Sequence, residues 1–402
     1  MIRIEKIKNC RICNSNNLDI VIRLNNMPFT DEFVKNQGKG KEFKSNIEIG
    51  ICNKCGSVQN MNDTEMDDYY NEYTYTVQSS GFAMSFMNKI ANKIKENFYE
   101  SNDNPKVFEI GSGSGEQLLE FKKIGFEVLG IEPSVKLSDY ANSIEVNTIT
   151  DFFDENSKTN IVEKYGTFDC VITSYTFDHI PVINKVLENI NYILNDNGIL
   201  VIEVHDLDLI IDRNEYCLFE HEHYTYLNKE TMKQFLSNHS FEVVTYDLLS
   251  QSEKRANSLL VVAKKINNVL AHKVDVNKEI DKIKSLNSNI IKSISRIDNF
   301  LLQNKNKKIV AYGAGGRGIM TIAAIKNYNL ISYIVDKNPK DENIYAPKSH
   351  LEVSHIDRLS SDRADIILVF SFGYFNEIVH EVSTKMSYSK DNFISILDLI
   401  KE

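Results

Sequence analysis

The sequence of 402 residues has no long apolar run, no tryptophan and only 6 prolines. No stretch of about 18 apolar residues occurs, which argues against a membrane-spanning helix. The first ten residues, MIRIEKIKNC, also lack the apolar core of a secretory signal peptide. We therefore expect a cytoplasmic protein that has no membrane partner.

Positive charge is scarce as well. The chain has 46 Lys and Arg against 56 Asp and Glu, which gives a net charge of −10. Tight binding to nucleic acid requires a basic surface, so this balance predicts no nucleic-acid partner. The hydrophobic content of 42% and the charged content of 25% are ordinary for a globular protein. The length suggests two or three domains.

Four of the 6 cysteines form two C-x-x-C pairs near the N-terminus, Cys10 with Cys13 and Cys52 with Cys55. In a chain without an export signal, such pairs favour a tetrahedral Zn²⁺ site over disulfides. Four sulfur ligands leave no open coordination position, so this zinc would be structural. The alternative is a set of ordinary reduced thiols.

The stretch from residue 107 to 132, VFEIGSGSGEQLLEFKKIGFEVLGIE, has the pattern of a strand, a glycine-rich turn, a helix and a second strand. The turn contains three alternating glycines, Gly111, Gly113 and Gly115. Glycines there let the backbone approach a ligand closely, and Glu132 at the tip of the second strand can accept hydrogen bonds from a ribose. The pattern predicts a ligand that carries a ribose.

A carboxylate, Glu109, precedes these glycines, and such a group suits a cationic ligand better than a pyrophosphate. The E-x-G-x-G-x-G pattern with an acidic strand end resembles motif I of class I S-adenosylmethionine (SAM) methyltransferases. This resemblance implies a SAM site at the turn, formed by Glu109, Gly111, Gly113, Gly115, Glu132 and Pro133. The alternative is an ordinary glycine-rich turn of an α/β domain.

Apolar periodicity predicts the organisation of the rest of the chain. We expect a zinc-binding domain over residues 1–75, whose end (60–75) is a connector, and a doubly wound α/β class I SAM methyltransferase domain over 76–265. Residues 266–303 lack glycine and proline and predict one long helix. A Rossmann-like domain over 304–402 then opens with a G-x-G-G-x-G turn at 313–318 and an acidic strand end at Asp336.

Candidate catalytic residues follow the strands of the central domain, where open α/β sheets bind their ligands. His179 comes shortly after the strand predicted at 168–173, and the cluster Glu220-His221-Glu222-His223 follows the strand predicted at 199–204. Histidine is the usual general base near neutral pH, and a neighbouring carboxylate can orient its ring. The alternatives are surface or helix-capping histidines, or a metal site in which His221 and His223 bind with Glu222 or His179.

The order of these motifs over nearly the whole chain resembles the sugar C-methyltransferases, which act on nucleotide-linked 4-keto-deoxysugars. The motifs are the two C-x-x-C pairs, Tyr73-Thr-Tyr75, the SAM motif through Pro133, Asp178-His179-Ile-Pro181, His221-Glu222-His223 and the glycine-rich third domain. The resemblance implies that SAM and structural Zn²⁺ are the cofactors and that a nucleotide sugar is the small-molecule partner.

The resemblance also implies roles for single residues. His223 would remove the proton next to the ketone, and the resulting enolate carbon would take the methyl group, while His179 and Glu222 would polarise the ketone or orient the base. Tyr73, Tyr75, Glu220 and His221 are the candidate substrate-binding residues.

Two departures from the family pattern bear on the substrate. Glu220 replaces a tyrosine, and the stretch Ala256-Asn257-Ser258-Leu259-Leu260 lacks the arginine of the family's G-G-S-L-R. Three other functions stay open: O- or N-methylation of a related sugar or small metabolite, an NAD-linked oxidoreductase and a zinc-dependent binding protein.

Overall fold

The apolar strands predicted after residue 106 form one seven-stranded sheet in the computed structural model, which describes residues 2–66, 80–101, 104–255 and 257–401. In chain order the strands are β6 (Lys106–Ile110), β7 (Glu127–Ile131), β8 (Thr148–Ile149), β9 (Phe168–Ser174), β10 (Leu194–His205), β12 (Phe241–Thr245) and β13 (Ser258–Lys265). Across the sheet they follow the order β12-β13-β10-β9-β6-β7-β8, and only β13 runs antiparallel to its neighbours.

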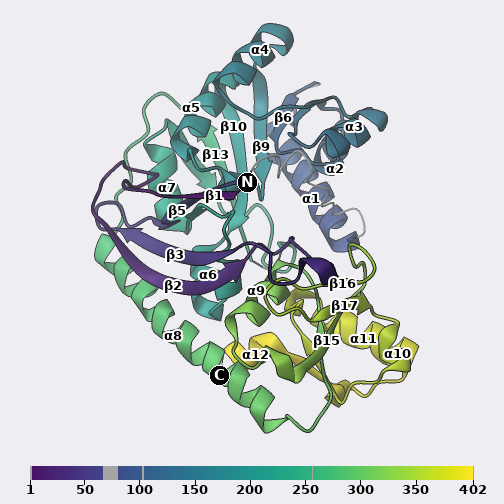
Figure 1. The fold of residues 1–402 in the computed structure, drawn as a ribbon. Helices are drawn as coiled ribbons and strands as arrows, with labels where there is room; N and C mark the ends of the chain where they lie inside the picture. The colour runs from purple at the N-terminus through teal and green to yellow at the C-terminus, as the bar shows by residue number, and fades with distance from the viewer. Residues whose placement is uncertain (1, 67–79, 102–103, 256, 402) are drawn as a thin grey trace.

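This order confirms the doubly wound class I methyltransferase core. The chain winds outward in both directions from β6, so the ends of β6 and β9 flank the topological switch point where such sheets bind ligands. Helices cover both faces (Figure 1). Their buried residues divide them between the two faces: α1 (Gly81–Phe98), α2 (Glu116–Lys123) and α3 (Val135–Ser143) on one, α4 (Glu155–Tyr165), α5 (Ile183–Ile193) and α7 (Lys229–Ser237) on the other.

The N-terminal segment forms a separate antiparallel sheet of β2 (Leu18–Pro28), β3 (Lys44–Cys52), β4 (Val58–Asn60) and β11 (Thr225–Tyr226). The last of these strands comes from the middle of the chain and pairs with β4, so the N-terminal unit and the central domain share one sheet. A second pair joins β1 (Ile2–Lys6) to β5 (Asn62–Met66). The connector expected over residues 60–75 therefore contains the strand β5, which has no local signal in the sequence because its partner strand is distant in the chain.

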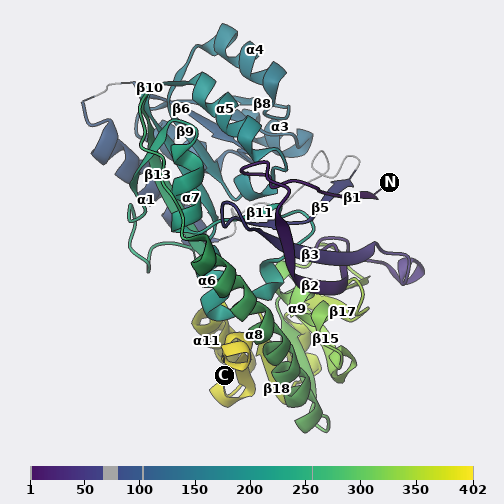
Figure 2. The same ribbon diagram turned by 90° about the vertical axis from the view of Figure 1, so that its left-hand side faces the viewer.

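The long helix predicted over 266–303 is α8 (Val276–Gln303), which starts ten residues later than the predicted segment. Its start is fixed by Asp275, whose side chain accepts a hydrogen bond from the backbone N–H of Lys278. One part of its apolar face packs on β2 and another on the C-terminal unit. In Figure 2 the helix runs from the central domain down to the C-terminal unit, so it links these two units.

The C-terminal segment forms a third sheet in the order β16-β17-β15-β14-β18-β19. Its strands are β14 (Ile309–Tyr312), β15 (Ile331–Asp336), β16 (Ile344–Tyr345), β17 (Glu352–His355), β18 (Ile366–Val369) and β19 (Phe393–Ser395). Its helices are α9 (Gly316–Ala324), α10 (Arg358–Ser361), α11 (Phe375–Met386) and α12 (Ile396–Lys401). None of the helices that the structure describes is long and apolar enough to cross a membrane.

We propose that the chain has a zinc-binding domain over 1–75, a methyltransferase domain over 76–265, a linker helix over 266–303 and a Rossmann-like domain over 304–402.

Candidate functional site

The four cysteines of the two C-x-x-C pairs lie together, and their sulfur atoms are all within 4.8 Å of one another. The Sγ atoms of Cys10 and Cys55 are 3.7 Å apart, and those of Cys13 and Cys52 are 3.6 Å apart. Four thiolates about 2.3 Å from one tetrahedral Zn²⁺ would be separated by roughly 3.8 Å. The donor set and its spacing therefore fit a structural zinc ion, with no position left for substrate.

The turn between Cys10 and Cys13 contacts the central domain through Arg11. The guanidinium of Arg11 donates a hydrogen bond to the carbonyl oxygen of Pro181 at 3.2 Å and lies 5.0 Å from the centroid of the Tyr224 ring. In return, the side-chain amide of Asn184 donates to the carbonyl oxygen of Arg11 at 2.5 Å. Pro181 follows His179 and Tyr224 follows His223, so the zinc unit supports both segments that carry the candidate histidines.

The glycine-rich turn after β6 adopts the left-handed backbone conformation that favours glycine. Gly111, Gly113 and Gly115 have φ values of +69°, +52° and +85°, a region that other residues rarely adopt. A Cβ on Gly111 would lie 2.3 Å from Oγ1 of Thr176, so only glycine fits there. Nothing lies within 4 Å of a Cβ placed on Gly113, so this part of the turn is open to a ligand.

Both candidate acidic residues of the SAM site lie at this turn and are almost fully buried. The two carboxylate oxygens of Glu132 accept hydrogen bonds from the N–H groups of Gly113 (2.9 Å) and Ser134 (2.8 Å), while Pro133 stands between Glu132 and Ser134. One oxygen of Glu109 is buried without a hydrogen-bond partner among the described residues. Burial raises the pKa of Glu109 well above its usual value, and the nearby Glu116 adds to this. The positive charge of Arg255 only partly opposes this shift. A buried acid at an open glycine turn fits a ligand that brings positive charge, as the sulfonium and ammonium groups of SAM do.

We propose that Glu132 accepts hydrogen bonds from the ribose, so replacing it with alanine should weaken binding of S-adenosylhomocysteine about 10-fold or more. Isothermal titration measures this directly. Glu127→Ala is the matched control, because Glu127 is an exposed glutamate at the other end of the same strand β7. Equal affinities for the two variants would contradict the assigned ribose contact.

The histidine cluster lies beyond the ends of β9 and β10. The rings of His179 and His223 are perpendicular, with centroids 4.5 Å apart, and the ring of His205 is 5.1 Å from that of His223. His179 ends the short 3-10 helix η2 (Phe177–His179), and His205 is the last residue of β10. The buried Asp178 accepts a hydrogen bond of 3.0 Å from Nδ1 of His205. Three imidazoles and a carboxylate therefore meet at one edge of the sheet.

The orientation of the His223 ring is fixed by the backbone. Its Nδ1 donates a hydrogen bond of 2.9 Å to the carbonyl oxygen of Leu218, which can only accept. The other nitrogen, Nε2, is then free to exchange a proton. Burial lowers the pKa of His223, but the negative charges of Glu220, Asp178 and Glu222 outweigh burial and raise it above the usual value. By contrast, burial lowers the pKa of His179 to about 3 and that of His205 to about 4. His223 thus has a clearly higher proton affinity than His179 and His205.

The other candidate residues of the loop 219–224 lie in different surroundings. Glu222 offers a carboxylate oxygen within 4.8 Å of ring nitrogens of His179 and His223, so it lies with the cluster. Glu220 is buried and accepts a hydrogen bond from the hydroxyl of Thr30 at 3.2 Å. His221 points elsewhere: its Nε2 donates to the carbonyl oxygen of Met27 at 3.0 Å.

The ring of His221 packs on Phe29 and Phe43 in the N-terminal unit, with centroids 5.1 and 5.2 Å away. The sequence placed His221 at the substrate, and in the metal alternative beside His223, because alternate residues of an extended chain share one side. The loop is not extended there, so the structure places His221 apart from His223, and its role in substrate binding stays a prediction. Tyr73 and Tyr75 lie outside the described residues.

The sequence analysis gave no role to three further residues of the site. Asp178 was only part of the motif before His179, and His205 was not singled out, although its position at a strand end was a usable signal. The third is Arg255, which precedes the stretch that lacks the family arginine. Its guanidinium lies 5.0 Å from the ring centroid of Tyr175 and 3.5 Å from a carboxylate oxygen of the buried Glu203. Tyr175 itself has a φ of +50° at the end of β9, a strained backbone often found at functional sites.

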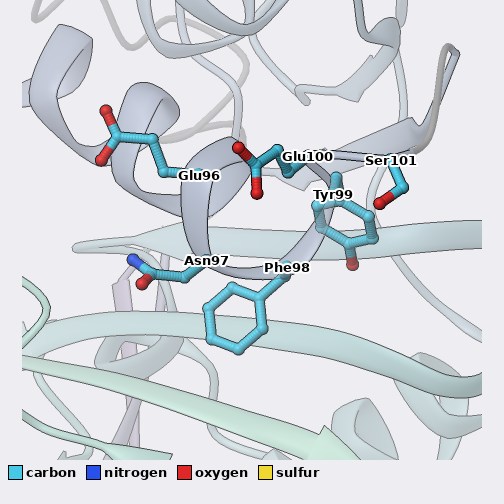
Figure 3. Close-up of a pocket in the computed structure, with 6 residues that line it drawn as sticks. All are labelled: Glu96, Asn97, Phe98, Tyr99, Glu100 and Ser101. Carbon is cyan, nitrogen blue, oxygen red and sulfur yellow. The ribbon is translucent and has the colours of Figure 1, made fainter.

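A surface hollow lies away from this cluster, at the end of α1. Figure 3 shows the six residues that line it, Glu96, Asn97, Phe98, Tyr99, Glu100 and Ser101. The hydroxyl of Tyr99 is already used, because it donates to the carbonyl oxygen of Asp169 at 2.6 Å. None of the candidate site residues lines this hollow, and we assign it no function.

Comparison with known families divides the chain into three consecutive matches. Residues 10–70 match a family of zinc-binding domains, residues 84–246 match a family described as "Methyltransferase domain", and residues 250–397 match one described as "C-methyltransferase C-terminal domain". Together with the sheet order and the glycine turn, these matches identify the central domain as a SAM-dependent methyltransferase domain. The C-terminal match also favours a methyltransferase over an NAD-linked oxidoreductase.

Among curated proteins, the chain is similar to the C-methyltransferase NovU of Streptomyces niveus, at 25% identity over 60% of this chain and 57% of that protein. It is also similar to an uncharacterized methyltransferase of Staphylococcus carnosus, at 29% identity over 36% of this chain and 61% of that protein. The matches thus span less than two thirds of these relatives' own lengths. Among solved structures, a magnesium protoporphyrin IX methyltransferase from Synechocystis aligns at 12% identity with a TM-score of 0.35, over 50% of this chain and 88% of that one.

Proposed function

We propose that the protein is a SAM-dependent C-methyltransferase of a nucleotide-activated keto-deoxysugar. The proposal is supported by the matches of its three domains to zinc-binding, methyltransferase and C-methyltransferase C-terminal families and by its similarity to the C-methyltransferase NovU. The observation that carries the proposal is the histidine cluster, which lies at the same sheet edge as the glycine turn. A base beside an electrophilic methyl group is the arrangement that carbon methylation next to a ketone requires.

In the proposed mechanism, Nε2 of His223 removes the proton from the sugar carbon next to the ketone. The electron pair of that C–H bond moves into the enolate, and the carbon then forms the new bond to the methyl group. SAM, when bound, supplies this methyl group and leaves as the neutral thioether. His179 and Glu222 lie beside His223, where they would polarise the ketone or orient the base. The proton on His223 returns to solvent at the end of the cycle.

Acceptor chemistry distinguishes this proposal from O- or N-methylation. A hydroxyl or amine acceptor requires no carbon acid, whereas the enolate mechanism requires removal of the proton next to the ketone.

The four clustered thiols are suited to zinc only while they stay reduced, which is consistent with the proposed site of action in the cytoplasm.

We expect the enzyme to exchange that carbon-bound proton for deuterium in D₂O when it is given a nucleotide-linked 4-keto-deoxysugar without SAM. Mass spectrometry of the recovered sugar nucleotide would show a gain of one deuterium, because enolate formation is reversible while no methyl donor is bound. The His223→Ala variant serves as the control for exchange without enzyme. Methylation of the same sugar without any such exchange, and with the methyl on oxygen, would overturn the carbon mechanism.

A further inference from the structure

The histidine cluster contains two overlapping groups of metal-binding side chains that share His223. The first group is His179, Glu222 and His223, and the second is Asp178, His205 and His223. Within each group the possible ligand atoms lie within 4.8 Å of one another. Ligand atoms about 2.1 Å from one tetrahedral ion are separated by roughly 3.4 Å, so small side-chain shifts would bring either group onto one metal ion.

The two groups differ in how their atoms are already bonded. In the second group, Nδ1 of His205 donates its proton to a carboxylate oxygen of Asp178 at 3.0 Å, so a metal ion would have to compete with this bond. In the first group, Nδ1 of His223 donates to the carbonyl oxygen of Leu218, which leaves the lone pair on Nε2 for a metal ion. Histidines that bind metals usually have their other ring nitrogen held in this way. The first group is therefore the better ligand set.

The backbone holds the two segments that carry these ligands at a fixed spacing. The N–H of Tyr224 donates a hydrogen bond of 2.8 Å to the carbonyl oxygen of Asp178, so the residue after His223 is tied to the residue before His179. Arg11 of the N-terminal unit contacts both segments as well. Ligands that are already positioned lose little conformational freedom when an ion binds.

The charge around the cluster favours a cation. The acidic side chains that are buried there are Asp178, Glu203, Glu220 and Glu222. Two arginines act on these acids, Arg255 through an ion pair with Glu203 and Arg317 through its charge near Glu220, so negative groups outnumber positive ones. Imidazole and carboxylate ligands together suit Zn²⁺ and related transition metals, whereas Mg²⁺ and Ca²⁺ prefer oxygen ligands.

We propose that His179, Glu222 and His223 form a second metal site, which binds a divalent transition-metal ion such as Zn²⁺ and inhibits the enzyme. The inhibition rests on the proposed function, because it follows from the role of His223 as the base. The bound ion takes the Nε2 lone pair that would otherwise accept the proton from the sugar carbon, so no enolate forms. Three protein ligands leave one position of a tetrahedral ion open to water, so this ion is removed more readily than the one held by four cysteines.

Titration of the full-length protein, with its structural zinc in place, with Zn²⁺ in a buffer that does not bind metal tests the site. We expect a second zinc ion per chain, by calorimetry and by mass spectrometry. Glu222→Gln and His179→Gln should each weaken this second binding about 10- to 100-fold or more, since even changes around a metal ligand have such effects. His272→Gln is the matched control, because it removes the imidazole of a surface pair with Glu230, 2.8 Å away and outside the cluster.

Deuterium exchange of the keto sugar without SAM gives the functional readout. We expect saturation of the second site to slow this exchange about 10²-fold or more, the contribution of a general base. Brief treatment with EDTA that leaves one zinc ion per chain should restore the exchange.

The affinity for S-adenosylhomocysteine serves as the measure of folding in the variants. The site is overturned if the wild type binds no second zinc, or if both cluster variants bind it as the wild type does. It is overturned too if both variants lose S-adenosylhomocysteine binding together with the second zinc, because the two side chains are then structural. Unchanged exchange with the second zinc bound would overturn the inhibition. A second zinc that depends on these residues, in a protein that exchanges no keto sugar, would leave the metal site standing and count against the proposed function instead.

Discussion

Replacing His223 with alanine is expected to lower kcat by about 10²- to 10⁴-fold, the usual contribution of a general base. Binding of S-adenosylhomocysteine should be unchanged, because the residues that we propose for this site lie on β6, β7 and the turns that follow them. The change leaves the Leu218 carbonyl without its 2.9 Å hydrogen bond from Nδ1. A His223→Asn variant can replace that bond through its side-chain amide and separates the loss of the bond from the loss of the base. Turnover of the keto sugar, followed by mass, gives the rate.

His355→Ala is the matched control for this substitution, since His355 is an exposed histidine of the C-terminal unit. Full turnover by His223→Ala with normal cofactor binding would refute the assigned base.

The pH profile of the activity gives a second test of His223 as the base. The base works when neutral, so activity is lost as the pH falls through its pKa, which nearby carboxylates raise above the usual value. Glu222→Gln removes one of these charges and should move this acid limb of kcat/KM to lower pH.

Removing the zinc ion is expected to abolish activity, although no zinc ligand belongs to the histidine cluster. A structural zinc contributes roughly 10–16 kcal/mol, which is as large as the whole stability of a typical domain, about 5–15 kcal/mol. The N-terminal unit should therefore lose its fold on chelation. The loop 219–224, which carries His223, should then lose its conformation too. The side chain of Asn60 in the N-terminal unit donates a hydrogen bond of 3.1 Å to the carbonyl oxygen of Glu220 in this loop, and β11, which follows the loop, pairs with β4. Zinc content by mass spectrometry, thermal unfolding and turnover would be measured together.

The double substitution Cys52→Ser and Cys55→Ser should reproduce the effect of chelation. Cys217→Ala provides the control, because Cys217 is a buried free thiol outside the zinc cluster. It should retain about one zinc ion per chain. Zinc-free protein with normal turnover would show that the N-terminal unit does not support the loop in the way that the contacts of Arg11 and Asn60 indicate.

Local sequence was enough to predict the glycine-rich strand–helix–strand unit, the helix α5 and the strands β9 and β10 of the central domain. The helix α5 has Ile183, Val186, Leu187 and Ile190 buried along one face, and this spacing is visible in the sequence. The glycine turn was predictable for a similar reason, since positive φ values restrict the choice of residue. Elements defined by distant partners were not predictable. The strand β5 exists because β1 pairs with it. The first ten residues of the predicted 266–303 helix lie before α8, and the last of them is its capping residue, Asp275.

The sequence by itself determined the chemistry that is available: four thiols at zinc spacing, a glycine turn between two acidic residues, and histidines after the central strands. Residue type and spacing set these features, so they need no knowledge of the fold. Only the tertiary structure decided which side chains meet. It placed His205 and Asp178 beside His223 and His221 against the rings of Phe29 and Phe43. Such meetings depend on packing between segments distant in the chain, and no local pattern records them.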